Sequence, residues 1–204
     1  MNKRLISLFL IFQIISAMLA MPASAANEEW DPFNGDKDVN IAFIGGSITA
    51  GMGYRNSVSE YLKEKYEGIV QGRKMSFYNA GKGGTGSHYG LLRLDRDVIS
   101  HNPDMVFIEF AVNDAGRAEE DIQGDFEGMI RLLQSLPNPP MITIVYTTLV
   151  QMSNEYEKQH KIAEYYGIPE IDFLQLMKDK GYTKPSDTSY DKLPTMWREL
   201  LLSN

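Results

Sequence analysis

Short apolar runs alternate with longer amphipathic stretches along the chain from residue 39 onward. The apolar runs predict five β-strands, at Val39–Ile44, Met75–Tyr78, Met105–Phe110, Met141–Tyr146 and Ile168–Ile171. Most of these runs are apolar on both faces, which is typical of strands covered by helices on both sides. Strands that alternate with helices predict an α/β fold built of βαβ units around a parallel sheet.

The amphipathic stretches predict the helices between these strands. Apolar positions spaced i, i+3, i+4 predict helices at Val58–Tyr66 and Ile122–Leu136. Two further helices, at about Tyr89–Ser100 and Asn154–Tyr166, are each followed by helix-breaking residues. After Asp172 the pattern weakens to a short helix that ends at Lys178 and a final amphipathic stretch, Trp197–Leu202.

The first 25 residues have the pattern of a secretory signal peptide. Lys3 and Arg4 precede an apolar run, Leu5–Ala20, and Ala23-Ser24-Ala25 supplies the small residues of a cleavage site. The run is short for a membrane span and contains Gln13, so it favours a signal peptide over an anchor. We therefore expect a secreted, extracellular protein, residues 26–204, with one domain and no stable membrane anchor after cleavage.

Composition narrows the chemistry. The formal net charge of −7 argues against nucleic acid as the main partner. There is no cysteine, and the three histidines (His88, His101 and His160) show no paired metal-ligand spacing. We therefore expect no metal and no cofactor, and chemistry based on hydroxyls, carboxylates, amides or imidazoles.

The loop after the first predicted strand carries a serine. In Gly45-Gly46-Ser47-Ile48-Thr49 the glycines permit a tight turn, and Ser47 is expected at the start of the next helix. There it could act as a nucleophile or simply as a helix N-cap, and this loop alone does not decide between them. The α/β-hydrolase elbow needs glycine where Thr49 stands, and the phosphate-binding P-loop needs a Gly-Lys pair that is missing here.

Two further strand ends carry candidate hydrogen-bond donors. Asn79–Ser87 is rich in glycine, so it could expose backbone N–H groups or could be only a flexible turn. Asn113 follows the third strand and could donate its side-chain amide to an oxyanion or form an Asx-turn. The carboxyl ends of parallel strands share one edge, so a serine and these donors together predict acyl transfer.

These blocks resemble those of the SGNH (GDSL) hydrolase family, in the same order over about residues 39–175. Gly45–Ile48 is similar to its first block, with Gly46 in place of the usual Asp. Asn79–Ser87, followed by Arg93-Leu94, is similar to the second block. The third block and the late helix and strand have counterparts in His101–Asp104, Val112-Asn113-Asp114 and Ile162–Asp172.

The resemblance implies a fold and a set of roles. The implied fold is a flavodoxin-like three-layer α/β/α sandwich with a five-stranded parallel sheet in the order 2-1-3-4-5. Ser47 matches the nucleophile, and Gly84 and Asn113 match the oxyanion residues. The implied activity is a serine esterase that forms an acyl-enzyme. A small-molecule or carbohydrate acyl ester, in particular an O-acetyl ester, is the implied substrate.

One part of the family pattern is missing. The family's late Asp-x-x-His pair has no match, and no histidine follows His160. We therefore expect a domain that is C-terminally incomplete. Of the three histidines, His88 is the possible substitute base, because His101 is expected at the amino end of the sheet and His160 within a helix. A catalytically impaired fragment that only binds ligand, or a flavodoxin-like phosphate- or flavin-binding protein, remains an alternative.

Overall fold

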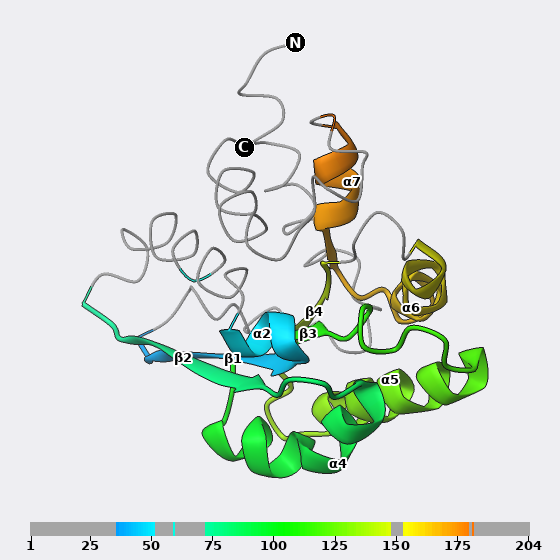
Figure 1. Cartoon of the computed structure of the whole chain (residues 1–204). Coiled ribbons are helices and arrows are strands. Elements are labelled where there is room, and N and C mark those ends of the chain that lie inside the picture. The colour runs from blue at the N-terminus through cyan, green and yellow to red at the C-terminus, as the bar shows by residue number, and fades with distance from the viewer. Residues whose placement is uncertain (1–35, 52–58, 60–71, 148–152, 180, 182–204) are drawn as a thin grey trace.

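The computed structural model describes residues 36–51, 59, 72–147, 153–179 and 181, and these residues form an α/β fold. Five parallel strands form one sheet in the order β2-β1-β3-β4-β5, as expected from the family resemblance (Figure 1). The strands are β1 (Val39–Gly45), β2 (Met75–Gly81), β3 (Met105–Glu109), β4 (Met141–Tyr146) and β5 (Glu170–Asp172).

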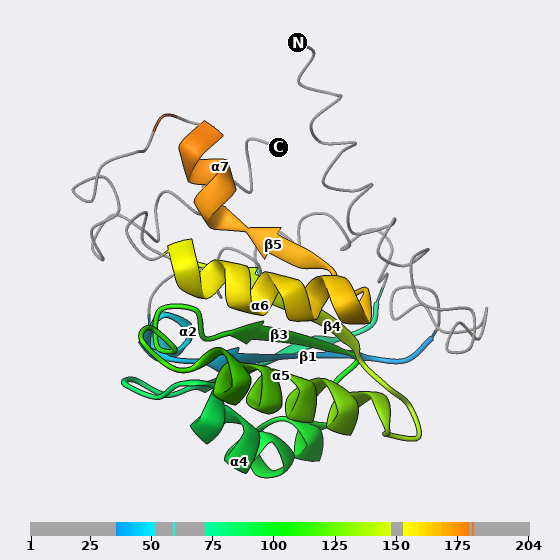
Figure 2. The same cartoon turned by 90° about the vertical axis from the view of Figure 1, so that its right-hand side faces the viewer.

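Helices lie on both sides of this sheet. The described helices are α2 (Ser47–Gly51), α4 (Ser87–Asp97), the 3₁₀ helix η1 (Ile99–His101), α5 (Glu119–Gln134), α6 (Ser153–Tyr166) and α7 (Phe173–Asp179). α4, α5 and α6 form a row on one side, whereas α2 and α7 lie on the other (Figures 1 and 2). The row follows from right-handed crossovers that all run in the same direction across the sheet, from β2 towards β5.

The register of the central strands aligns their carboxyl ends. Gly45 at the end of β1 pairs with Gly81 of β2 on one side and with Glu109 of β3 on the other. The loops that leave these three strands therefore start side by side at one edge of the sheet. This is the edge where open parallel sheets carry their functional groups.

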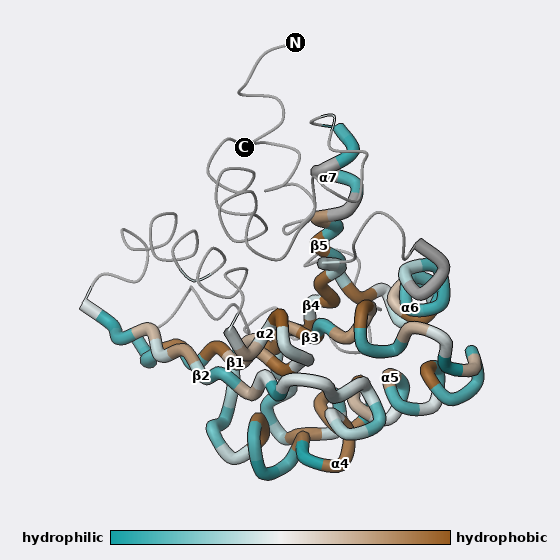
Figure 3. The backbone as a smooth tube through the Cα atoms, viewed as in Figure 1, coloured by the Kyte–Doolittle hydropathy of each residue, from teal (hydrophilic) through white to brown (hydrophobic). Residues whose placement is uncertain are grey.

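The central strands β1, β3 and β4 are buried on both faces, as their apolar composition predicts, whereas the edge strands β2 and β5 are mostly half-buried. Ala42 and Ile44 of β1 belong to the core cluster that includes residues of α4, α5 and α6. Ile41 and Phe43 point the other way and are also fully buried, and Phe43 stacks on Phe107 at 4.9 Å. In Figure 3 much of the central strands is brown, while much of the tube of α4 and α5 is teal.

Several predicted boundaries need correction. β2 continues to Gly81, so residues Asn79–Gly81 belong to the strand and not to the glycine-rich loop. β3 ends at Glu109, one residue early, and β5 begins at Glu170 rather than at residue 168. The helix expected at 89–100 is α4 followed by η1, which ends where Asn102 adopts a left-handed φ of 47°. The amino-acid pattern gave the elements but not the exact hydrogen-bonded ends.

Some predictions lie outside the described residues. These are the signal peptide at residues 1–25, the helix at 58–66 apart from helical Ser59, and the stretch 197–202. Within the described ranges, no helix has the length and apolarity that crossing a bilayer requires.

Candidate active site

Ser47 is the first residue of α2, directly after β1, as the sequence predicts. Two glycines make this sharp transition possible. A Cβ at Gly45 would lie 2.4 Å from the carbonyl oxygen of Glu109, so only glycine allows the turn to pass this close to β3. The first turn of α2 closes when Ala50 N–H donates to the Gly46 carbonyl at 3.0 Å. Ser47 is half-buried.

Asn113 lies against the backbone of Gly46. Its own N–H donates to the Phe110 carbonyl at 3.0 Å, which fixes the turn after β3. A Cβ at position 46 would lie only 1.9 Å from Asn113 Oδ1, so the amide occupies the space that a side chain at position 46 would take. Asn113 Oδ1 is buried and lacks a hydrogen-bond partner in the described part of the chain. The family's usual Asp at position 46 would not fit beside this amide.

The glycine-rich loop lies on the other side of Ser47. Lys82 N–H donates to the Gly45 carbonyl at 2.9 Å and ties the start of this loop to the end of β1. A Cβ at Gly83 would lie 3.8 Å from Ser47 Cβ, so the loop backbone is in contact range of the serine. Gly84 is exposed and has a φ of 71°, a conformation that favours glycine. The three predicted residues thus lie on loops that converge at one edge of the sheet.

Arg93 of α4 donates hydrogen bonds to the ends of two of these strands, β2 and β1. Its Nη1 donates to the Ala80 carbonyl at 2.5 Å and its Nη2 to the Gly45 carbonyl at 3.1 Å. The side chain is 4% exposed. Sequence analysis placed Arg93 in the second block without a role. An arginine at a helix position that faces the sheet, where an apolar residue is normal, was the available signal.

Asp114 links the loop after β3 to the end of the glycine-rich loop. Its buried Oδ1 accepts hydrogen bonds from the Ser87 N–H at 2.9 Å and from Arg117 Nη1 at 3.0 Å. Its Oδ2 accepts one from Gln159 Nε2 at 3.0 Å. Burial raises the pKa of the Asp114 carboxyl. The residue next to Asn113 therefore holds the end of the glycine-rich loop, a role that sequence analysis did not assign.

Glu109 at the end of β3 is fully buried. Thr49 Oγ1 donates to its Oε2 at 3.1 Å, and Thr147 Oγ1 donates to its Oε1 at 2.8 Å. The N–H of Gly46 also lies near this carboxylate and lowers its pKa. Glutamate within an apolar run was a visible signal, because a buried carboxylate needs partners. The partners themselves come from α2 and from the residue after β4.

The three histidines lie in different surroundings. His88 is the second residue of α4, its side chain is 68% exposed, and its Nδ1 lies 3.6 Å from Asp125 Oδ1. His101 stacks on Tyr78 at 4.1 Å in η1, before β3, on the amino side of the sheet as expected. His160 lies in α6, 2.9 Å from Glu170 of β5. No hydrogen bond joins Ser47 to any of the three, so His88 as a substitute base stays a prediction.

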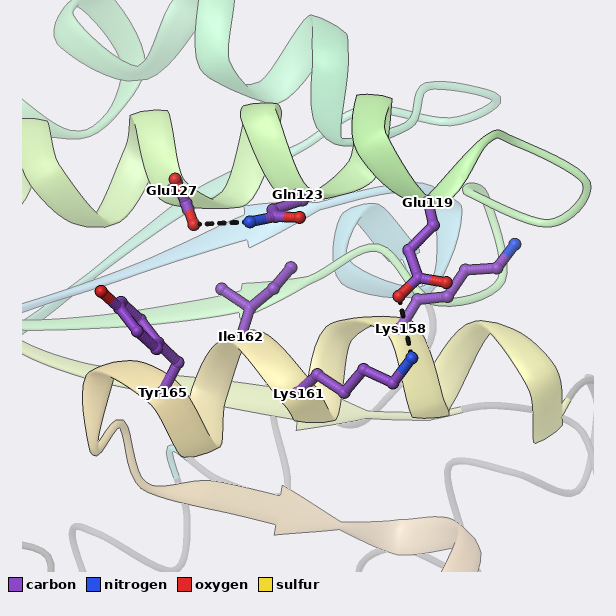
Figure 4. Close-up of a pocket in the computed structure, with 7 residues that line it drawn as sticks. All are labelled: Glu119, Gln123, Glu127, Lys158, Lys161, Ile162 and Tyr165. Carbon is purple, nitrogen blue, oxygen red and sulfur yellow. Dashed lines mark hydrogen bonds and ion pairs between the residues drawn. The ribbon is translucent and has the colours of Figure 1, made fainter.

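A groove of about 350 Å³ lies elsewhere, between α5 and α6 (Figure 4). Polar side chains that line it bond to one another. Lys161 Nζ lies 2.8 Å from Glu119 Oε1, and Gln123 Nε2 donates to Glu127 Oε1 at 2.9 Å. None of the lining residues comes from the three loops around Ser47. The groove is therefore separate from the candidate active site.

The five-stranded parallel sheet is an α/β hydrolase-like fold, with a serine after the first strand, a glycine-rich loop after the second and an asparagine after the third. The model of the GDSL-like lipase/acylhydrolase family matches residues 43–193, and the chain belongs to this family. A comparison with curated proteins finds no match.

Solved structures of esterases share the fold. A two-domain esterase active on acetylated mannans, co-crystallised with mannopentaose, is 25% identical with a TM-score of 0.66. The match covers 81% of this chain and 49% of that one, so the chain spans about half of that protein's length. An acetylxylan esterase from Geobacillus stearothermophilus is 18% identical with a TM-score of 0.67, covering 83% and 93%. A GDSL-like lipase described as putative, from Parabacteroides merdae, is 19% identical with a TM-score of 0.67, covering 84% and 99%.

Proposed function

We propose that the protein is a serine esterase that removes O-acetyl groups from carbohydrates through an acyl-enzyme on Ser47. The convergence of the three loops carries this proposal. Ser47 begins α2, the Asn113 amide lies against Gly46, and Gly83 lies beside the Ser47 side chain. A hydroxyl between backbone and amide donors is the arrangement that acyl transfer needs.

In the proposed reaction, Ser47 Oγ bonds to the acyl carbon and its proton passes to a base. The carbonyl oxygen becomes an oxyanion, which the N–H groups of Ser47 and Gly84 and the Asn113 amide stabilise. The carbon–oxygen bond to the alcohol then breaks, and the alcohol leaves with a proton. Water attacks the acyl-enzyme in the second half and releases the acid, which regenerates the Ser47 hydroxyl.

The base is the open element of this proposal. In the part of the chain that the structure describes, the three histidines make their contacts with Asp125, Tyr78 and Glu170 and not with Ser47. This favours a second candidate function, a catalytically impaired domain that binds acyl-carbohydrate. Oxyanion stabilisation and binding alone still leave measurable rate enhancement, so the two candidates differ in rate rather than in site.

The carbohydrate substrate class rests on similarity. One structural relative is active on acetylated mannans, and another is an acetylxylan esterase. We also propose that the protein is secreted, because the polysaccharides on which it would act lie outside the cell. If residues 1–25 are a signal peptide, the mature protein recovered from the culture medium begins at residue 26.

The test is acetate release from acetylated mannan, acetylated xylan and p-nitrophenyl acetate by the purified protein. We expect release by the wild type and a loss of about 10³-fold or more in Ser47→Ala, because the nucleophile is removed. His88→Ala shows whether this imidazole is the base. A folded wild type that binds acetylated oligosaccharide without turnover would support the impaired domain. Equal rates for wild type and Ser47→Ala would contradict the proposal.

A further inference from the structure

Glu109 is a buried ionisable residue that the proposed chemistry does not use. Its side chain is fully buried at the carboxyl end of β3, the strand beside β1. Leaving a carboxylate here is unfavourable unless donors surround it, and a leucine-like side chain would fit an apolar run better. Its presence therefore calls for a reason connected with its partners.

Two of the groups around the Glu109 carboxylate flank Ser47 in the chain, and a third follows β4. The Gly46 N–H, one residue before the serine, lies near the carboxylate and lowers its pKa. Thr49 Oγ1, two residues after the serine, donates to Oε2 at 3.1 Å. Thr147 Oγ1, directly after β4, donates to Oε1 at 2.8 Å. The carboxylate thus binds the nucleophile loop on both sides of Ser47 and joins it to the next strand end.

We propose that Glu109 is the positioning residue of the nucleophile: its carboxylate holds Gly46 and Thr49 and thereby fixes Ser47 for attack on the acyl carbon. The inference rests on the proposed function, since it concerns the same serine. The backbone N–H of Gly46 can only donate, and both threonine hydroxyls donate here, so these surroundings suit an ionised carboxylate, which only accepts hydrogen bonds. Protonation would turn one carboxyl oxygen into a donor, so one of the threonine hydroxyls would have to accept in place of donating.

The charge state of Glu109 should therefore be visible in the reaction. Burial, together with the nearby Asp114 carboxylate, raises the pKa of the Glu109 carboxyl to about 7. Asp114 is the charged group that acts on Glu109 from the loop after β3, while α2 and the end of β4 supply the neutral Thr49 and Thr147. Ionisation at neutral to alkaline pH completes the three bonds that hold the loop.

The first experiment compares two matched substitutions, Glu109→Gln and Glu170→Gln. Glu170 is also a glutamate in a strand, but it is half-buried, and it bonds to Tyr146 and His160 and not to the nucleophile loop. For p-nitrophenyl acetate, we expect Glu109→Gln to lower kcat by about tenfold to a hundredfold, because small misplacements of the nucleophile are costly. KM should stay within about twofold because the acyl site is retained. The Glu170 variant should keep the wild-type kcat.

The pH profile separates positioning from a general loss of structure. In the wild type, kcat should rise with the ionisation of a group near pH 7, and this rise should disappear in Glu109→Gln. Thr49→Val should lower kcat more than Thr147→Val, because only Thr49 lies on the nucleophile helix. The proposal would be overturned if Glu109→Gln kept the wild-type kcat and pH profile, or if both glutamine variants lost activity in proportion to stability.

A second readout keeps this inference independent of the proposed function. Amide hydrogen exchange at Gly46 reports how the nearby Glu109 carboxylate holds this N–H, whether or not the protein turns over substrate. We expect faster exchange at Gly46 in Glu109→Gln than in the wild type and in Glu170→Gln. No Ser47-dependent hydrolysis by the wild type would refute the esterase alone. Unchanged Gly46 exchange in Glu109→Gln would refute the positioning role.

Discussion

At the residue scale, Gly46 controls the position of Asn113. A methyl group at position 46 would lie 1.9 Å from Asn113 Oδ1 and 2.6 Å from its Cγ, so the amide must move. Loss of one oxyanion donor typically costs about 10²-fold or more in kcat. We therefore predict that Gly46→Ala lowers kcat for p-nitrophenyl acetate by about 10²-fold, with little change in KM.

Gly51 provides the control for this prediction. It lies at the end of the same short helix, and a Cβ there would meet nothing within 4 Å. Gly51→Ala should therefore keep wild-type kinetics. If Gly46→Ala also keeps them, the Asn113 amide does not act on the acyl group from this position.

At the element scale, α4 packs against the turn after β3 at Gly90. A Cβ at this position would lie 2.5 Å from Cζ of Phe110, whose ring is fully buried. Overpacking of this kind costs about 1–3 kcal/mol. We predict that Gly90→Ala lowers the free energy of unfolding by this amount, measured by urea denaturation.

A glycine in α5 gives the opposite expectation. Gly124 is exposed within the helix, and a Cβ there would meet no atom within 4 Å. Alanine should stabilise an exposed helix interior by about 0.5–1 kcal/mol relative to glycine. Gly90→Ala and Gly124→Ala should therefore change the free energy of unfolding in opposite directions. Equal responses would contradict the packing described for α4.

Sequence alone predicted the elements because their signals are local. β1, with apolar residues on both faces, and α5, with its apolar stripe, were recognisable from neighbouring residues. The convergence of the loops of Ser47 and Asn113 followed from topology, since parallel strands end at one edge. The strand ends were less predictable, as the three extra residues of β2 show.

Contacts between distant residues could not be predicted in the same way. Thr49 and Thr147 lie 60 and 38 positions from Glu109, and their bonds to its carboxylate depend on the sheet register. The sequence indicated only that a buried glutamate needs partners. The network of Asp114 with Ser87 and Gln159 is of the same kind, because it joins the loop after β3 to α4 and α6.

At the scale of the whole molecule, buried carboxyls make stability depend on pH. The pKa of Glu109 is about 7 in the folded protein, against 4.5 as its ordinary value. Its protonated form is therefore favoured by folding, and its contribution is fully present below about pH 4.5 and lost as pH rises through 7. The difference corresponds to about 3 kcal/mol.

Other groups act in the same direction. Burial raises the pKa of the Asp104 carboxyl, and the hydrogen bond to Glu170 raises the pKa of His160. We predict that the free energy of unfolding, measured with urea, falls between about pH 5 and pH 8, and that Glu109→Gln reduces this slope. An unchanged slope in the variant would show that Glu109 does not titrate in this range.

This dependence opposes the one expected for catalysis. The ionised Glu109 that weakens folding is the form that holds the nucleophile loop, so stability and positioning favour different charge states. Buried groups at functional sites commonly carry such a cost. The acidic residues that outnumber basic ones across the chain, 27 against 20, add charge repulsion in the same pH range.

The central claim is that Ser47 accepts the acyl group, and the acyl-enzyme itself can be measured. The protein is mixed with p-nitrophenyl acetate, quenched rapidly in acid, digested and analysed by mass spectrometry. We predict one acetyl group on the peptide that contains Ser47, bound to its Oγ, and none on this peptide in Ser47→Ala. Acetate release by the wild type with the acetyl group on another residue, or equal release by Ser47→Ala, would contradict the account.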